Sequence, residues 1–426
     1  MTESLRRVAI VGGSRIPFCR SNSLYADKSN LDMLSAAIDG VVNRFKLAGE
    51  QLDEVMAGAV MTHSRDFNLA REAVLSSKLS PLTPGITMQQ ACGTSLQAAL
   101  TIGAKIATGQ IESGIAAGTD TTSDAPIVFS DKFAHRMINL SQARTMKQRM
   151  AALKGFGPGE LKPVSPTNGE LRTRLSMGQH CERMAQEWHI KREDQDQLAF
   201  DSHQKAADAY ESGFFDELVT PWSGVSRDNN LRPDTSLEKL ATLRTVFDKG
   251  PRATLSAGNS TSLTDGAAAV LLCSEEWAAE HDLPVQAYLT TGRSAAVDFV
   301  NDEGLLMAPT VAVAEMLQRT GLKLQDFDYY EIHEAFAAQV LCTLEAWESK
   351  QYCRERLGLK KPLGSIDRDK MNIHGSSLAV GHPFAATGAR IIATLAQILE
   401  NKGSGRGLIS VCTAGGMGVC AILERP

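Results

Sequence analysis

The sequence predicts an α/β fold in which a mainly parallel sheet carries helices on both faces. Short apolar runs typical of buried strands alternate with segments whose apolar residues recur at helical spacing, and this alternation occurs twice along the chain. The length of 426 residues allows two or three domains. The hydrophobic content of 43% is ordinary for a globular protein.

The first elements follow from these patterns. Residues 8–18 (VAIVGGSRIPF) are typical of a buried strand that ends in a turn, and their glycine pair lacks the GxGxxG spacing of a dinucleotide loop. Residues 31–45 have the apolar spacing of an amphipathic helix. Residues 55–61 are predicted to be a strand, and residues 68–79 a helix that ends before Pro81.

Cys92 lies where a predicted strand end at residues 85–88 gives way to a helix that Gly109 terminates. At a helix start, unpaired N–H groups and the positive end of the helix dipole favour a thiolate. The neighbours at 91 and 93–95 are small, so a substrate could approach the sulfur. The alternative is a buried structural cysteine, which is the commoner role of a single Cys in an apolar run.

Residues 114–120 are predicted to form a further strand and turn, after which the composition changes. From residue 131 to residue 250 charge density rises and the apolar runs shorten, which indicates an insertion of helices and loops. Its first predicted helix is basic on one side and apolar on another. The basic residues are Lys132, Arg136, Arg144, Lys147 and Arg149, and the apolar ones are Leu140, Ala143, Met146, Met150 and Leu153. The basic side of this helix either faces solvent or is a docking surface. The ligand of such a surface would be a nucleotide phosphate, a partner subunit or an anionic membrane.

The second half of the chain repeats the alternation. Residues 254–273 are predicted to be a strand, a polar loop and a second strand, and residues 328–332 a strand that ends at His333. His382 precedes an Ala-rich helix, and Cys412 lies in a strand followed by a glycine turn and a return strand. Cys92 and His382 thus occupy similar places, which suggests a duplicated unit whose two helix N-termini face a shared site.

Charge and cysteine content exclude several classes of function. The net charge is 44 − 49 = −5, so no general basic field favours a nucleic acid. The eight cysteines include no CxxC pair, which argues against zinc and a thioredoxin-type site. Strand-like residues begin at Arg7, and no apolar run reaches membrane-spanning length. We therefore expect a cytoplasmic protein with reduced thiols, no metal, and at most peripheral membrane contact.

Five motifs in order carry a family resemblance: QQACGTS, SAGNSTSLTDGAA, HEAF, GHPFAATGAR and CTAGGMG. Together they resemble the thiolase family over nearly the whole chain. The HEAF form and the segment QARTMKQRM are most similar to the β-subunits of the trifunctional fatty-acid oxidation complex and their bacterial counterparts. The resemblance implies a layered α-β-α-β-α core of two duplicated βαβ halves. It places these halves at residues 1–130 with 251–277 and at 278–426, and a loop domain at 131–250.

The resemblance also implies roles for residues. Cys92 would be the nucleophile, His382 its base, and Cys412 the second acid/base at the α-carbon of acetyl-CoA. The backbone N–H groups of Cys92 and Ala414 would form one oxyanion hole, and His382 with a water held by His333 the other. His333 replaces the usual Asn, and Ala414 replaces a Gly. The residues implied to bind coenzyme A and substrate are Met177, Phe247, Ala257, Thr261, Met307 and Phe336.

The implied activity is cleavage of 3-ketoacyl-CoA by CoA in fatty-acid β-oxidation, with coenzyme A as substrate and no metal or redox cofactor. A short-chain acetoacetyl-CoA thiolase is the alternative within the family. A ketosynthase would lack the second cysteine of the CTAGG turn, and an inactive scaffold would not need Cys92, His382 and Cys412 together. The resemblance further implies a homodimer or a dimer of dimers, and the basic insertion helix suggests docking on a hydratase/dehydrogenase α-subunit.

Overall fold

The computed structural model describes residues 5–426. Its strands are β1 (Val8–Arg15), β2 (Cys19–Arg20), β3 (Glu54–Ala57), β4 (Gly85–Thr87), β5 (Ser113–Asp120), β6 (Thr264–Ser274), β7 (Ala287–Ala296), β8 (Tyr329–Ile332), β9 (Gly405–Thr413) and β10 (Met417–Arg425).

The α-helices are α1 (Asn30–Arg44), α2 (Leu69–Ser76), α3 (Thr94–Ala107), α4 (Asp131–Gln142), α5 (Met146–Leu153), α6 (Met177–Glu187), α7 (Arg192–Glu211), α8 (Leu237–Ala241), α9 (Glu275–Glu280), α10 (Ala308–Thr320), α11 (Ala337–Glu348), α12 (Lys350–Glu355), α13 (Ser377–Val380) and α14 (Thr387–Lys402). The 3-10 turns are η1 (Ser64–Asp66), η2 (Pro158–Leu161), η3 (Phe299–Asn301), η4 (Arg368–Lys370) and η5 (Phe384–Ala386).

The strands pair in the order β4-β3-β5-β6-β1-β7-β10-β9-β8, with β2 added beside β6. The prediction of a mainly parallel sheet is wrong. Among the described strands, only the pairs β3–β4, β3–β5 and β8–β9 are parallel, and the centre of the sheet is antiparallel. The reason is connectivity. A parallel neighbour needs a crossover, whereas the turn between β9 and β10 spans only three residues and joins them as a hairpin.

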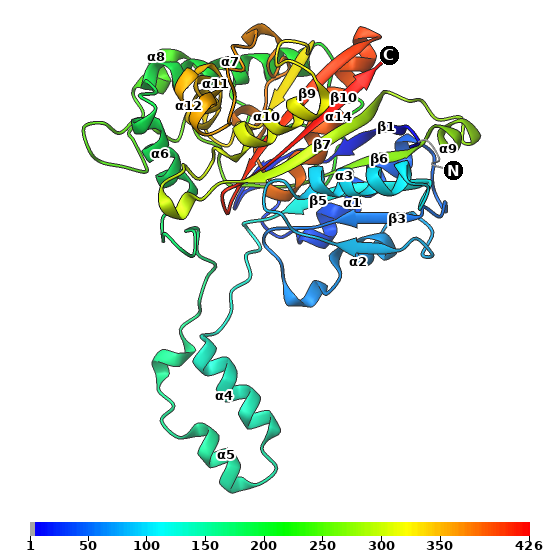
Figure 1. Cartoon of the computed structure of the whole chain (residues 1–426). Coiled ribbons are helices and arrows are strands. Elements are labelled where there is room, and N and C mark those ends of the chain that lie inside the picture. Colours follow the sequence, from blue (N-terminus) through cyan, green and yellow to red (C-terminus); the bar gives the residue numbers. More distant parts are fainter. Residues whose placement is uncertain (1–4) are drawn as a thin grey trace.

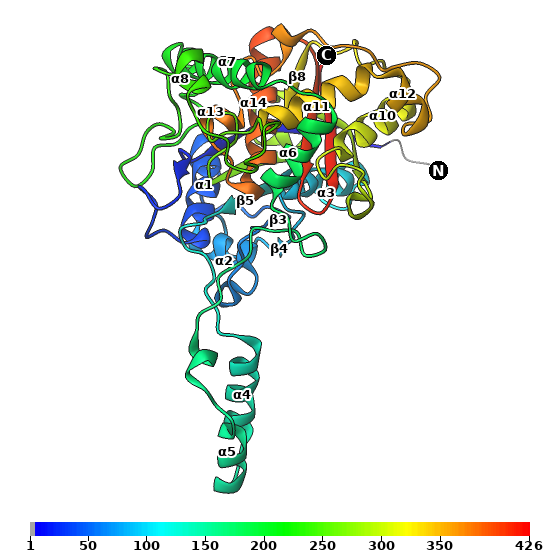
Figure 2. The same cartoon turned by 90° about the vertical axis from the view of Figure 1, so that its left-hand side faces the viewer.

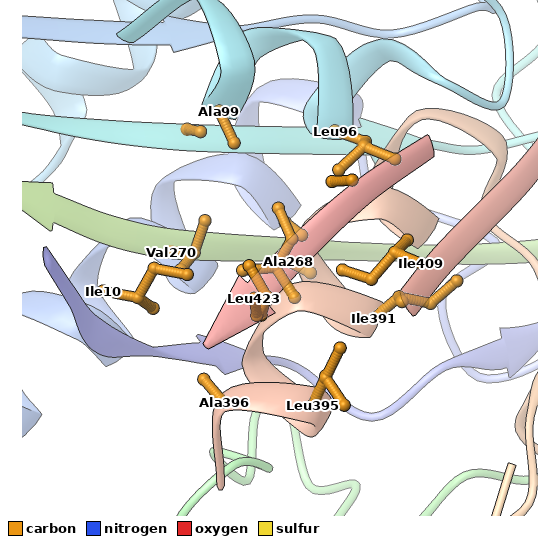
Figure 3. Packing of buried hydrophobic residues seen from close by; sticks show 14 of the residues in the cluster. Ile10, Leu96, Ala99, Ala268, Val270, Ile391, Leu395, Ala396, Ile409 and Leu423 are labelled. Carbon is orange, nitrogen blue, oxygen red and sulfur yellow. The ribbon is translucent and has the colours of Figure 1, made fainter. Parts of the chain in front are cut away.

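The sheet has two halves, which are joined where β1 meets β7 through two residue pairs, Ala9–Tyr288 and Ile10–Ala287. Alternate residues of each strand face opposite ways. On β6, Ala268 and Val270 pack with α3 and α14, whereas the alternate residues Ala267, Ala269 and Leu271 pack with α1 and α2. Figure 3 shows side chains of α3 and α14 meeting those of β1, β6, β9 and β10.

The outer face of the second half of the sheet is covered by α10 and α11, whose apolar residues pack with alternate residues of β8, β9 and β10. The order α1/α2, sheet, α3/α14, sheet, α10/α11 can be followed in Figure 1. This is the predicted α-β-α-β-α core. The predicted domain boundaries remain a prediction, and residues 1–4 of the first predicted half lie outside the described residues.

The two central helices approach closely at a glycine. A Cβ added to Gly388 of α14 would lie 2.3 Å from the backbone nitrogen of Leu96 in α3, closer than any side chain can sit. Glycine therefore allows the two backbones to touch. The contact fixes the starts of both helices relative to one another, and these starts carry Cys92 and His382.

Residues 254–263 do not form the predicted strand. Their backbone is held by buried side chains instead: Glu182 accepts hydrogen bonds from the N–H groups of Thr254 and Leu255, and Asn259 accepts one from Ser256. Only β6 forms, beginning at Thr264. The periodicity of an apolar run cannot reveal that side-chain acceptors satisfy its backbone.

The segment between β5 and β6 divides into two parts (Figures 1 and 2). The arm, residues 129–163, holds α4, α5 and η2 and projects away from the layered core. Its base is a pair of reciprocal backbone hydrogen bonds between Val128 and Val164. In contrast, α6, α7 and α8 pack on the core, with α6 and α7 against α11.

The predicted basic helix is two helices. Thr145 accepts a hydrogen bond from the N–H of Gln148, whose side chain bonds back to Thr145, and this capping box starts α5 after three residues that separate it from α4. Neither helix has a buried residue. Arg136 and Lys132 are not free cations, because both pair with Glu160 of η2. No helix within residues 5–426 is long and apolar enough to cross a membrane.

Candidate active site

Cys92 occupies a tight loop between β4 and α3, and its side chain is almost fully buried. Thr94 closes the loop: its hydroxyl donates to the carbonyl of Ala91 at 2.7 Å and accepts from the N–H of Gln90 at 2.9 Å. Ala91 has φ +47°, a conformation that L residues rarely adopt and that favours glycine. Such strain next to a reactive group is characteristic of functional sites.

His382 reaches Cys92 from the other half of the chain. Its Nε2 lies 3.1 Å from Cys92 Sγ, and its Nδ1 lies 2.5 Å from the hydroxyl of Thr387. The loops that carry the two residues are tied together by Ser95, which donates to the carbonyl of Ala385 and accepts from the N–H of Ala389. The predicted meeting of two helix starts is therefore present, with a sulfur and an imidazole in contact.

Burial sets the charge state of this pair. It raises the pKa of the Cys92 thiol to about 12, although backbone N–H groups of Ala414 and of Cys92 itself lower it by bonding the sulfur. Burial and the nearby Arg390 cation lower the pKa of His382 to about 3. The expectation that the helix start would favour a resting thiolate is wrong, because desolvation outweighs the helix N–H groups. At neutral pH the pair is a thiol and a neutral imidazole.

Cys412 lies in β9, directly before the turn that contains Ala414, and is buried. Burial raises the pKa of its thiol well above the ordinary value, and a negative charge on Cys92 would raise it further. The turn places the Ala414 N–H at the sulfur of Cys92. Glu170, beyond the base of the arm, accepts a hydrogen bond from the N–H of Gly415 at 2.8 Å.

His333 follows β8 and is fully buried beside His382, with ring centroids 4.1 Å apart. Its Nδ1 lies 2.9 Å from the hydroxyl of Ser377, and its Nε2 has no hydrogen-bond partner in the described part of the protein. The Cys92 sulfur and one ring nitrogen of each histidine lie within 4.8 Å of one another, so these three side chains could also hold a soft metal ion.

Four of the six predicted coenzyme A and substrate residues meet in one apolar cluster that also contains Cys412. They are Met177, Phe247, Met307 and Phe336. The rings of Phe247 and Phe336 are in edge-to-face contact. Thr261 bonds to the carbonyl of Ala335, next to this cluster. Ala257 is exposed, although its loop neighbours Ser256 and Asn259 are buried, and it is not part of the cluster.

Sequence reasoning missed the groups that hold the site together. The carboxylate of Asp120 accepts N–H bonds from Met61 and Ala385, and so joins the end of β5 to the loop after His382. Ser377 and Arg390 contact each other behind His333. Arg390 ends the motif GHPFAATGAR around His382 and Ser377 precedes this motif by four residues, but only the fold shows which partners the two side chains face.

Comparisons with known proteins identify relatives over nearly the whole chain. A model of the thiolase N-terminal domain matches residues 8–276, and a model of the thiolase C-terminal domain matches residues 283–425. The chain is 40% identical to a 3-ketoacyl-CoA thiolase of Shewanella loihica over 424 residues, which cover 98% of this chain and 97% of that protein. A 3-ketoacyl-CoA thiolase of Shewanella frigidimarina is 39% identical with the same coverage.

Two solved structures show the same fold. An acetyl-CoA acetyltransferase of Bacillus anthracis superposes with a TM-score of 0.82 at 27% identity and covers 99% of this chain and 100% of that one. Human mitochondrial 3-ketoacyl-CoA thiolase in complex with CoA superposes with a TM-score of 0.81 at 26% identity and covers 99% of this chain and 98% of that one.

Proposed function

We propose, from the premise that the chain belongs to the thiolase family of acyltransferases, that it cleaves 3-ketoacyl-CoA with CoA into acetyl-CoA and a shortened acyl-CoA. The observation that carries this proposal is the contact of 3.1 Å between Cys92 Sγ and His382 Nε2, with the Ala414 N–H directed at the sulfur. A nucleophile, its base and a backbone donor for an oxyanion are thus assembled at one point.

Because Cys92 rests as a neutral thiol, the first step includes its deprotonation. His382 takes the proton of Cys92 as the sulfur attacks the C3 carbonyl of the substrate, and the resulting oxyanion needs hydrogen-bond donors. The bond between C2 and C3 then breaks, which leaves the acyl group on Cys92 as a thioester. The departing acetyl-CoA carbanion takes a proton from Cys412. Because a buried thiol is a weak acid, Cys412 keeps its proton until this carbanion forms.

The second step regenerates the enzyme. The thiol of CoA gives its proton to the Cys412 thiolate and attacks the thioester on Cys92, so that shortened acyl-CoA leaves and the Cys92 sulfur recovers its proton from His382. Each proton and each sulfur is accounted for without a redox or metal cofactor. We propose that Cys92, His382 and His333 serve as reacting groups and not as metal ligands, since a metal on the sulfur would block its attack.

The substrate should lie along the apolar cluster of Met177, Phe247, Met307 and Phe336. These side chains share one cluster with Cys412, which suits the pantetheine arm and the acyl chain. The solved human relative holds CoA, which supports coenzyme A as substrate. A second candidate is a short-chain acetoacetyl-CoA thiolase, which the similarity to the acetyl-CoA acetyltransferase of Bacillus anthracis favours.

We further propose a homodimeric core or a dimer of dimers, and an α-subunit with hydratase and dehydrogenase activity as a partner of the arm. The arm carries exposed Met146 and Met150. Arg144, Lys147 and Arg149 lie beside them and pair with no carboxylate among residues 5–426. A partner with acidic and apolar patches would complement this surface. Free cysteines throughout the chain support a reducing, cytoplasmic location and a place in fatty-acid β-oxidation.

The test is the thiolysis rate over a chain-length series of 3-ketoacyl-CoA substrates. We expect activity on medium or long chains and a loss of at least about 10³-fold in Cys92→Ser, because a hydroxyl is a far weaker nucleophile than a thiol. Intact mass after incubation with acetyl-CoA should show an acetyl adduct that Cys92→Ser lacks. Activity restricted to acetoacetyl-CoA would favour the short-chain candidate, and the absence of both turnover and adduct would contradict the proposal.

A further inference from the structure

The hydroxyl of Ser377 has an unusual pair of neighbours. Ser377 begins α13 and is fully buried. Its Oγ lies 2.9 Å from Nδ1 of His333 and 2.8 Å from Nη2 of Arg390. A guanidinium group has donors and no acceptor, so Arg390 must donate to Ser377 Oγ. The oxygen of Ser377 therefore faces Arg390, and its hydrogen points elsewhere.

That hydrogen has one available acceptor. Among residues 5–426, the only acceptor within hydrogen-bond distance of Ser377 Oγ is Nδ1 of His333. A buried O–H without an acceptor is destabilising, so Ser377 donates to Nδ1. If Nδ1 carried the proton instead, the hydroxyl hydrogen of Ser377 would be buried and unpaired.

The proton of His333 must then be on its other nitrogen. Burial and the nearby His382 and Arg390 lower the pKa of His333 well below its ordinary value, so the ring is neutral and carries one proton. Nε2 is buried and has no partner in the described protein, and a ring nitrogen of His333 lies within 4.8 Å of the Cys92 sulfur and of His382. Nε2 of His333 thus carries an unpaired, buried N–H on one of the three side chains that also include Cys92 and His382.

His382 provides the contrast. Its Nδ1 also meets a hydroxyl, that of Thr387, but this hydroxyl has a second acceptor in the carbonyl of Pro383 at 3.5 Å. Thr387 can therefore accept from Nδ1 of His382, which leaves the Nε2 lone pair free to take a proton from Cys92. The two histidines have equivalent hydroxyl partners but opposite tautomers.

We propose that Ser377 and Arg390 are positioning residues that hold the proton of His333 on Nε2, so that His333 donates directly to the carbonyl oxygen of the substrate. This inference rests on the proposed thiolysis and deepens it, because it replaces a water held by His333 with the imidazole itself. Arg390 remains charged in its buried place: its pKa falls only to about 10, with Glu331 at 3.7 Å.

The direct test is nitrogen-15 NMR of the unmodified enzyme with labelled histidine, in which a one-bond coupling to hydrogen marks the protonated nitrogen. We expect the His333 proton on Nε2, with the signal assigned by its loss in His333→Gln. A proton on Nδ1 of His333 would overturn the inference. Because this measurement needs no variant at Ser377, it stands even if such a variant fails to fold.

Kinetics provide the second test. Ser377→Ala should lower kcat by about tenfold or more with little change in KM, because an oxyanion donor acts mainly in the transition state. Ser377→Thr, which restores a hydroxyl, should recover most of that loss. Ser376→Ala is the matched control, since Ser376 contacts Arg390 but not His333. It should leave the tautomer of His333 unchanged and lower kcat less than Ser377→Ala does.

Equal losses of kcat in Ser376→Ala and Ser377→Ala, or a wild-type kcat in Ser377→Ala, would overturn the inference. Failure of the underlying function is distinguishable from failure of this inference. If the unmodified enzyme forms no acetyl adduct on Cys92 and cleaves no 3-ketoacyl-CoA, the proposed function is wrong. If both reactions occur and the proton is on Nδ1 of His333, only the positioning role is wrong.

Discussion

The central helix α14 and the two helices of the arm differ most in how far their residues are buried. Every residue of α14 from Thr387 to Leu399 is buried, whereas neither helix of the arm has a buried residue. The site depends on the packing of α14, because Thr387 of α14 contacts His382 and Arg390 is itself part of α14. The arm makes its own internal contacts and leaves the reacting groups untouched. Catalysis and assembly should therefore be separable by mutation.

The largest effect is expected where α3 and α14 touch. Gly388→Ala places a Cβ 2.3 Å from the backbone nitrogen of Leu96, and overpacking of this kind costs about 1–3 kcal/mol. We expect a lower denaturant midpoint and a fall in kcat, because the loops of Cys92 and His382 move apart. Gly157→Ala in the arm is the matched control, since its Cβ would meet no atom within 4 Å. Equal destabilisation in both variants would contradict the comparison.

A smaller effect is expected at Glu170, six residues beyond the base of the arm at Val164. Glu170→Ala removes the acceptor of the Gly415 N–H, next to the Ala414 N–H that bonds the Cys92 sulfur. A hydrogen bond of about 1 kcal/mol corresponds to roughly a fivefold fall in kcat. Glu160→Ala, a carboxylate that pairs within the arm, should leave kcat unaltered. If both variants slow the reaction equally, the arm acts on catalysis as a whole.

The difference between these regions also explains what the sequence could predict. The motifs around Cys92, His382 and Cys412 predicted which residues form the site, and the structure brings Cys92 and His382 into contact. The antiparallel centre of the sheet was missed, since periodicity identifies strands and not their partners. Ser377 and Arg390 were missed because a hydrogen bond between two buried polar residues depends on the fold. In the arm, the break before Thr145 was missed since the apolar spacing of Leu140, Ala143 and Met146 continues across it.

The pH dependence of the site should be nearly flat. With the pKa of His382 lowered to about 3 and that of Cys92 raised to about 12, neither group of the free enzyme titrates between pH 5 and 7.5. We expect kcat/KM for the 3-ketoacyl-CoA to change by less than about twofold over this range. If the base had the ordinary histidine pKa, kcat/KM at pH 5 would be roughly 30-fold below its maximum. Such an acidic limb would contradict the burial of His382, unless it follows Asp120, whose pKa burial raises to about 7.

The smallest effect on catalysis is expected from removal of the arm. Val128 and Val164 exchange both backbone hydrogen bonds, so residues 129–163 can be replaced by Asn-Gly as a two-residue hairpin turn. Thiolysis and thermal stability should remain within about twofold and a few degrees of the intact enzyme, because α4 and α5 bury no residue. Complexes that contain this protein in native extract should have a lower mass, because the proposed α-subunit no longer binds. A variant without thiolysis activity would contradict the separation of catalysis from assembly.

The order of the strands has a consequence for synthesis on the ribosome. The proposed nucleophile Cys92 is translated early, but its proposed base His382 follows 290 residues later, and Cys412 follows later still. The strand β10, which pairs with both β7 and β9, is translated after every other strand described. A nascent chain therefore carries Cys92 without its partner and β7 with an open edge. The reactive pair forms only as the last strands are released, so an interrupted chain has no acyltransferase activity and exposes an edge that quality control can recognise.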